Sequence, residues 1–278
     1  MRVSVLFVLV CVVVGALTAA VCLRPVKAPA AAERPVVYLP PATATAAPEP
    51  ADEVVSVDVR GEWSWALRDL GAGAVVGDGT LRTTTASMIE AWLAVDYLAS
   101  RSSRVPAGDE ARVTRMVRDG DDRAAQTLYR RLGGDASITR MVRTCGLRDT
   151  RIHPGRWAMT TMSAADASLL GRCVARGPGL SPPWRAKLLD LMRPAGAAAG
   201  IPEAPVFAGL HPAVGNGWTR QGNWWAVHCL AIWDRWVLAV LVHYPEQGTG
   251  HRYGTQVCKS VAQQLFGRTD PGVRRIGG

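Results

Sequence analysis

Residues 83–100 (TTTASMIEAWLAVDYLAS) constrain the fold more than any other stretch of this chain. Nearly every side chain between positions 88 and 98 is apolar, and only Glu90 and Asp96 carry charge. A helix that is apolar on almost all faces belongs inside a domain rather than on its surface. The stretch therefore predicts a buried helix around which the rest of the domain packs.

Ser87 and Glu90 lie three residues apart at the start of this helix, so both fall on one face of its first turn. One interpretation is a capping box, in which Ser87 accepts from a free backbone N–H and Glu90 reaches back to the Ser87 N–H. The other is a nucleophile position, with a polar partner one turn further on. On this stretch alone, the commoner use of the spacing favours the cap.

Residues 1–24 contain an almost unbroken apolar run that is long enough to span a bilayer. We favour an uncleaved N-terminal membrane anchor over a cleaved signal. The protein is then exported, either anchored with an extracytoplasmic domain or secreted if the segment is removed. Cys22 suggests a lipoprotein cysteine, but Val21 before it is a poor fit to the small residue needed there.

Residues 25–52 are rich in Pro and Ala and predict a semi-extended linker. Residues 53–270 are long enough for one well-cored domain, and residues 271–278 form a short tail. The net charge of +9 suits a negatively charged envelope surface. Nucleic acid is disfavoured because export removes that partner and no nucleic-acid motif occurs. We expect a monomer.

Four cysteines lie outside the anchor: Cys145, Cys173, Cys229 and Cys258. An even number in an oxidising compartment predicts two disulfides, for which three connectivities are possible. The spacing does not resemble a zinc site, and we expect no metal and no cofactor.

Strands are predicted at residues 54–59, 63–70 and 73–76, and again at 224–232 and 236–244. Between them lie predicted helices, several with Arg-rich polar faces, at residues 109–118, 122–131, 136–143, 163–175 and 182–192. A closing helix is predicted at 255–266. This order indicates an α+β domain whose sheet is made from both ends of the chain.

Three short motifs follow one another along the chain: Ser87-Met88-Ile89-Glu90, Gly120-Asp121-Asp122 and Gly215-Asn216-Gly217-Trp218. Their order and spacing resemble the serine β-lactamase and penicillin-binding-protein superfamily, whose marks are S-x-x-K, S-D-N and K-T-G. The resemblance covers about residues 53–268 and is closest to exported class A β-lactamase-like proteins of high-GC bacteria. It implies an antiparallel sheet flanked by helices, with a mostly helical insertion.

The motifs are degenerate at the positions that do the chemistry. Glu90 and Gly215 stand where the superfamily has its two lysines, Gly120 replaces the serine of S-D-N, and Asp122 stands where Asn is usual. The loop at residues 149–160 also lacks a deacylating glutamate. Of the catalytic side chains of these motifs, only Ser87 remains. A serine hydroxyl is a poor nucleophile without a neighbouring base, so the sequence predicts a pseudoenzyme.

The resemblance implies that backbone N–H groups of the serine and of Trp218 persist as an oxyanion hole. The pseudoenzyme would then act by binding, with peptidoglycan or another envelope component as the expected partner. Replacing a lysine by Glu90 predicts poor binding of anionic ligands, because a like-charge contact near 4 Å costs on the order of 4 kcal/mol at an effective dielectric of 20.

Two alternatives remain open. Ser87 could be activated by Glu90, aided by Asp121, in a hydrolase whose acidic cleft takes neutral or cationic substrates. A metal held by Glu90, Asp121 and Asp122 is the weaker idea, because Asp121 suits turn hydrogen bonds and Asp122 suits a helix cap.

The resemblance also implies a disulfide pairing, Cys145 with Cys173 and Cys229 with Cys258. Each bond would contribute roughly 2–4 kcal/mol of stability.

Overall fold

The computed structural model describes residues 55–101, 104–198 and 212–266. The predicted anchor at residues 1–24, the linker and the C-terminal tail lie outside the described residues. The predicted strand at residues 54–59 is wrong, because its described part, residues 55–59, forms no strand.

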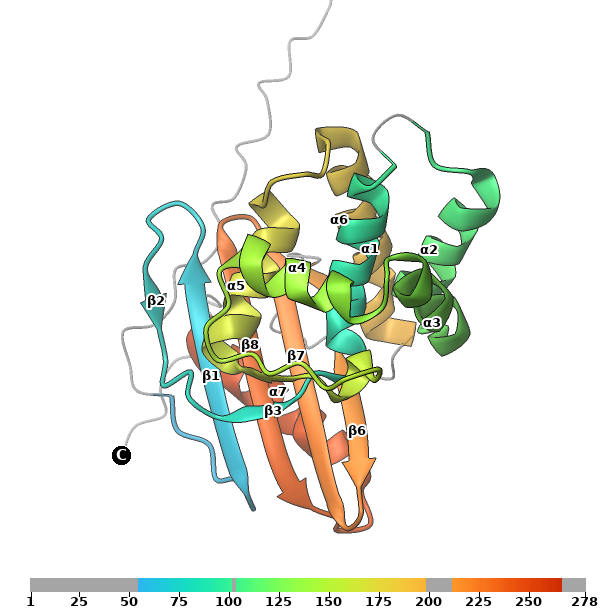
Figure 1. Ribbon diagram of the computed structural model, residues 1–278. Helices are drawn as coiled ribbons and strands as arrows, with labels where there is room; N and C mark the ends of the chain where they lie inside the picture. Colours follow the sequence, from blue (N-terminus) through green and yellow to red (C-terminus); the bar gives the residue numbers. More distant parts are fainter. Residues whose placement is uncertain (1–54, 102–103, 199–211, 267–278) are drawn as a thin grey trace, which may run out of the picture. The chain divides into compact units, whose positions relative to one another are not determined.

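One antiparallel sheet of six strands joins the two ends of the domain (Figure 1). Its order is β2-β1-β8-β7-β5, and β6 also pairs with β7. The strands are β1 (Glu62–Asp69), β2 (Val75–Val76), β5 (Ala213–Val214), β6 (Gly217–Gln221), β7 (Trp224–Trp233) and β8 (Trp236–Pro245). Strand β1 pairs with β8 over its whole length, which confirms the predicted sheet made from both chain ends.

The alternation of side chains along β7 and β8 separates two apolar layers. Leu230 and Val237 face the helical layer, whereas Val227 and Val240 face the closing helix α7 (Arg252–Phe266). The two strands meet at a two-residue turn in which Asp234 has a φ of 44°. Aspartate tolerates this left-handed conformation better than most residues.

The predicted buried helix is α1 (Glu90–Ala99), entered through a 3-10 turn at Ala86–Ile89. Every residue of α1 from Glu90 to Leu98 is buried. Five helices complete this layer: α2 (Ala107–Asp119), α3 (Asp122–Arg131), α4 (Asp135–Cys145), α5 (Ala164–Arg176) and α6 (Pro182–Ala198). A small sheet of β3 (Arg82–Thr84) and β4 (Thr161–Ser163) lies ahead of α1 and α5. The fold is thus organised around the stretch that the sequence singles out (Figure 1).

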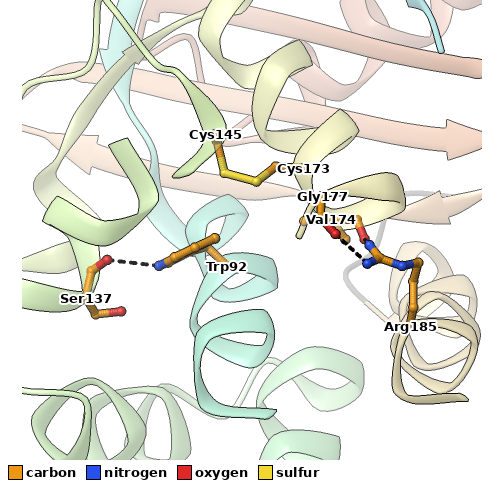
Figure 2. The surroundings of a disulfide bond; sticks show 7 residues. All are labelled: Trp92, Ser137, Cys145, Cys173, Val174, Gly177 and Arg185. Atoms are coloured by element: carbon orange, nitrogen blue, oxygen red, sulfur yellow. Dashed lines mark hydrogen bonds between the residues drawn. A yellow bond between two sulfur atoms is a disulfide. The ribbon is translucent and has the colours of Figure 1, made fainter. Parts of the chain in front are cut away.

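Two disulfides hold elements of the domain together, with the pairing that the resemblance implied. The Cys145–Cys173 bond joins α4 to α5, and the Cys229–Cys258 bond joins β7 to α7. Near the first bond, the indole Nε1 of Trp92 donates to the carbonyl oxygen of Ser137 at 3.0 Å, which connects α1 to α4 (Figure 2).

Candidate functional site

A cleft of about 990 Å³ lies where the start of α1, the α2–α3 loop, the segment before β4 and the β5–β6 corner meet. It brings together most residues of the three motifs: Ser87, Glu90, Gly120, Asp122, Gly215, Asn216 and Trp218. Gly217 and Asp121 are absent from its lining. Residues that are far apart in the sequence therefore share one site.

Ser87 lies in the 3-10 turn ahead of α1 and is half-buried. The capping-box interpretation is wrong, because no side chain caps either the 3-10 turn or α1. The preceding residue, Ala86, has a φ of 44°. A non-glycine residue in this region stores strain on the order of 1–3 kcal/mol, and such strain is concentrated at functional sites.

Strand β6 approaches the Ser87 turn so closely that only glycine fits at position 217. A Cβ atom on Gly217 would lie 2.7 Å from the Ser87 amide nitrogen and 2.8 Å from the Met88 amide nitrogen. Trp218, the next residue, is among the residues that line the cleft. This placement is what an oxyanion hole built from the Ser87 and Trp218 amides requires, and that role of Trp218 stays a prediction.

The β5–β6 corner is held by β7. The Gly215 N–H donates to the Leu230 carbonyl at 2.9 Å, and the Asn216 Oδ1 accepts from the Leu230 N–H at 3.3 Å. The Asn216 side chain thus stabilises the corner. Gly215, at the position where the superfamily has the lysine of K-T-G, has no side chain.

Glu90 is buried at the floor of the cleft, with 5% of its surface exposed, and its Oε1 has no hydrogen-bond partner among the described residues. Burial raises the pKa of Glu90 to about 8, and the negative charges of Asp122 and Asp121 act in the same direction. A hydrogen bond with Ser87 opposes this shift. At pH 7 the neutral acid therefore predominates.

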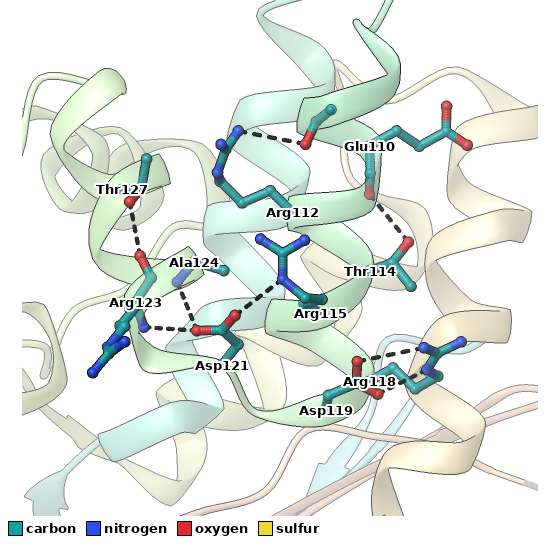
Figure 3. Close-up of polar contacts among 11 residues, drawn as sticks. Glu110, Arg112, Thr114, Arg115, Arg118, Asp119, Asp121, Arg123, Ala124 and Thr127 are labelled. Carbon is teal, nitrogen blue, oxygen red and sulfur yellow. Dashed lines mark hydrogen bonds and ion pairs between the residues drawn. The ribbon is translucent and has the colours of Figure 1, made fainter.

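The Gly120-Asp121-Asp122 motif lies at the junction of α2 and α3. Figure 3 shows the contacts of its Asp121. Gly120 ends α2 in a left-handed conformation, with φ 67° and ψ 36°. The Asp121 carboxylate caps α3 by accepting from the N–H groups of Arg123 and Ala124, both at 3.0 Å, and it pairs with Arg115 at 3.1 Å. The cap predicted at Asp122 is therefore wrong, because Asp121 performs this task and Asp122 is left facing the cleft.

This arrangement removes the basis for a metal site. Asp121 is committed to the α3 cap and is not among the residues that line the cleft with Glu90 and Asp122. Within the described residues, no group of three His, Cys, Asp or Glu side chains could hold a metal ion.

The expectation of an acidic cleft is also wrong. Four arginines line its walls, Arg118, Arg123, Arg130 and Arg156, against the carboxylates of Asp119, Asp122 and the mostly neutral Glu90. The sequence could have predicted that two of these arginines lie together. Arg123 and Arg130 lie seven residues apart, which is two helical turns, and so they share one face of α3.

None of the described residues that line the cleft is a lysine. Lys187 of α6 forms an ion pair with Glu110 of α2, and Lys259 lies on α7, which packs against the other face of the sheet. The third lysine, Lys27, lies outside the described residues.

The sheet order, the central helix and the cleft at its start define the fold of the serine β-lactamases and penicillin-binding proteins. An ancestral class A β-lactamase superposes with a TM-score of 0.55 at 19% identity, over 73% of this chain and 93% of that one. A β-lactamase from Desulfarculus baarsii gives a TM-score of 0.55 at 20% identity, over 74% and 91%. A mutant of PBP-A in an acyl-enzyme complex with penicillin G gives 0.55 at 20% identity, over 73% and 89%.

Within this class, a family model described as "Beta-lactamase enzyme family" matches residues 103–209. Curated relatives named "Putative lipoprotein LppW", from Mycobacterium tuberculosis and Mycobacterium bovis, are 32% identical over 108 residues, which are 37% of this chain. The match spans about a third of those relatives, 34% of their length. The chain thus has the fold of the serine β-lactamases and penicillin-binding proteins, and its residues 103–209 are similar to the β-lactamase enzyme family.

None of the helices in the described part of the chain is both long and apolar enough to cross a membrane.

Proposed function

We propose that this chain is an exported, envelope-associated β-lactamase-like protein that acts by binding and has little or no acyl-transfer activity. Two observations support export. The two disulfides suit an oxidising compartment, and the curated relatives are named as lipoproteins.

One observation supports the loss of catalysis: the side chain one turn after Ser87 is the buried acid Glu90, and none of the described residues that line the cleft is a lysine. Acyl transfer needs a base that removes the serine proton as the nucleophile attacks. A protonated Glu90 already holds the proton that it would have to accept. An oxyanion hole without an activated nucleophile contributes binding but little turnover.

The test is covalent labelling of the purified protein with a fluorescent penicillin between pH 6 and pH 7, where Glu90 is mostly protonated, followed by intact mass. We expect no adduct on Ser87. A stoichiometric adduct that disappears in Ser87→Ala would overturn the proposal. A double variant, Glu90→Lys with Gly215→Lys, serves as the positive control because it restores both cations. The nearest atom to a Cβ on Gly215 lies at 3.5 Å, so a side chain fits there. We expect Ser87 of this double variant to be acylated at least tenfold faster than Ser87 of the unchanged protein.

A second candidate, a serine hydrolase with Glu90 as its base, is favoured by one specific observation. A pKa of about 8, together with the hydrogen bond to Ser87, makes Glu90 competent to accept a proton in mildly alkaline solution. Such an enzyme would hydrolyse chromogenic esters at a rate that rises through pH 8. Both Ser87→Ala and Glu90→Gln would abolish that rate. A flat profile, equal in both variants, would exclude this candidate.

A further inference from the structure

Three arginines that line the cleft have no side-chain partner in the part of the chain that the structure describes. Arg123 and Arg130 lie on the cleft face of α3, with Gln126 and Thr127 between them, and Arg156 lies on the adjoining loop. The other face of α3 is packed into the core through Ala124, Ala125, Leu128 and Tyr129. The helix is thus amphipathic, and its polar face is a boundary of the cleft.

Three of the four arginines that line the cleft differ from the fourth, Arg118, in having no side-chain partner among the described residues. In the described part of the chain, no ion pair or side-chain hydrogen bond engages Arg123, Arg130 or Arg156. Neighbouring arginines are paired: Arg115 with Asp121 and Arg118 with Asp119 (Figure 3). The distinction separates arginines that stabilise the α2–α3 loop from arginines that are available to a ligand.

Holding these cations together is unfavourable for the folded protein. Three exposed cations that have no partner among the described residues repel one another, an effect that Asp119 and Asp122 of the same lining reduce without removing. Arg123 also lies in the first turn of α3, where the helix dipole disfavours a cation. Nothing in the packing of α3 requires charge at these positions, since their side chains are exposed. A ligand of opposite charge would relieve the repulsion among these arginines.

The floor of the cleft has a different character. Glu90 presents an unpartnered Oε1, and Asn216 and Thr219 add uncharged polar groups. The wall and the floor together fit a ligand with negative groups toward α3 and a neutral polar part over Ser87. The two ends of the α3 wall, Arg123 and Arg130, are about 10 Å apart along the helix axis at 1.5 Å per residue.

We propose that the cleft binds an acidic peptide whose separate carboxylates are received by Arg123, Arg130 and Arg156. This proposal rests on the binding role argued above. Arginine forks match carboxylates in a bidentate geometry. Asp122 and Asp119 lie among the arginines, so a uniform polyanion such as polyphosphate meets repulsion along the wall. A peptide avoids it by placing uncharged residues opposite these aspartates, and its amides match Asn216, Thr219 and the acid of Glu90.

The test measures fluorescence anisotropy of dye-labelled Gly/Ser hexapeptides on the purified protein at pH 7. The first peptide carries two Glu residues separated by two positions, and matched peptides carry Gln or Lys instead. Unlabelled polyphosphate is added as a competitor, to test whether the arginines bind a polyanion in place of an acidic peptide. We expect the Glu peptide to bind at least tenfold more tightly than the Gln and Lys peptides. Its affinity should fall as salt rises.

The variants locate the binding. Arg123→Gln with Arg130→Gln should weaken binding of the Glu peptide at least tenfold. Arg143→Gln, the same change of charge at an exposed position of α4 outside the cleft, should weaken it less than twofold. Unchanged thermal melting of each variant shows that folding is intact.

Three outcomes would overturn the proposal: equal binding of the Glu and Gln peptides, an equal loss in Arg143→Gln, or tighter binding of polyphosphate through the same arginines. If any of these outcomes is found and penicillin does not label Ser87, an acidic peptide is excluded as the ligand, and the proposed binding function still stands. Acylation of Ser87 removes the proposed function, whatever the peptides do.

Discussion

Two buried acids on the same helix, Glu90 and Asp96, have opposite surroundings. They lie six residues apart on α1, with 5% and 9% of their surfaces exposed. The Asp96 carboxylate accepts from Ser137 Oγ at 2.6 Å and from Arg140 Nε and Nη2 at 2.9 and 2.6 Å. Glu90 keeps one oxygen with no partner.

The difference shows what each acid does. Asp96 and its partners connect α1 to α4, and Arg140 extends the network by donating to the Leu132 carbonyl at 2.8 Å. A buried carboxylate with several charge-assisted donors stabilises the fold. Glu90 faces the cleft with its Oε1 unpartnered among the described residues, and burial raises its pKa and favours the neutral acid. A buried polar group that costs stability and lines a cleft indicates a functional site.

The largest loss of stability should come from Asp96→Asn. This change leaves Arg140 without its counter-charge and places an amide donor against the Ser137 hydroxyl. We expect a loss of about 3 kcal/mol in the free energy of unfolding, at the low end for a broken buried pair because 42% of the Arg140 side chain is exposed. Urea denaturation at pH 7 measures it. A loss below about 0.5 kcal/mol, the range of ordinary surface substitutions, would mean that Asp96 is no more structural than Glu90.

The chemically equivalent change Glu90→Gln should instead increase the free energy of unfolding. The pKa of Glu90 is raised in the folded protein from 4.5 to about 8, so the folded state holds a proton that the unfolded state releases. The stability associated with this group is fully present below pH 4.5 and is lost as the pH rises to about 8. At pH 7 the loss is on the order of 3 kcal/mol, and Gln removes it.

Urea denaturation of both proteins between pH 4 and pH 9 tests this sign. The two curves should lie close together at pH 4 and separate progressively, with Glu90→Gln the more stable at pH 8. Curves that stay parallel over this range would show that the carboxylate is already ionised in the folded protein. Glu90 and Asp96 would then no longer differ in the way described.

The elements were predictable because their signals are local. The apolar run through residues 88–98 could only be a buried helix, and the β-branched and aromatic segments on either side of Asp234 could only be a hairpin. The error at residues 54–59 has the same origin. Its alternating valines resemble a strand, yet Val55, Val57 and Val59 pack against the α7 layer without pairing to the sheet.

The chemistry of the cleft was less predictable because it depends on distant residues. The sequence located Ser87, Glu90, Asp122 and Asn216 through their motifs. It could not show that burial would neutralise Glu90, and the expected repulsion of anions assumed a charged carboxylate. Arg156 is a residue of an irregular loop, so no periodicity places it beside α3. The balance of positive and negative charge in the cleft could therefore be determined only from the fold.

The smallest effect should come from Asp122→Asn, which tests whether the state of Glu90 is set by the cleft. Asp122 is the largest charge contribution to the raised pKa of Glu90, after burial itself. Removing it should lower the midpoint by roughly half a unit to one unit, equivalent to about 1 kcal/mol. Carbon-13 NMR titration of the Glu90 carboxyl measures the midpoint directly. Asp119→Asn is the matched control, because Asp119 lines the same cleft but is not among the groups that shift Glu90. A midpoint that stays near 8 in Asp122→Asn would attribute the neutral acid to burial alone, and Glu90 would then differ from Asp96 only in lacking donors.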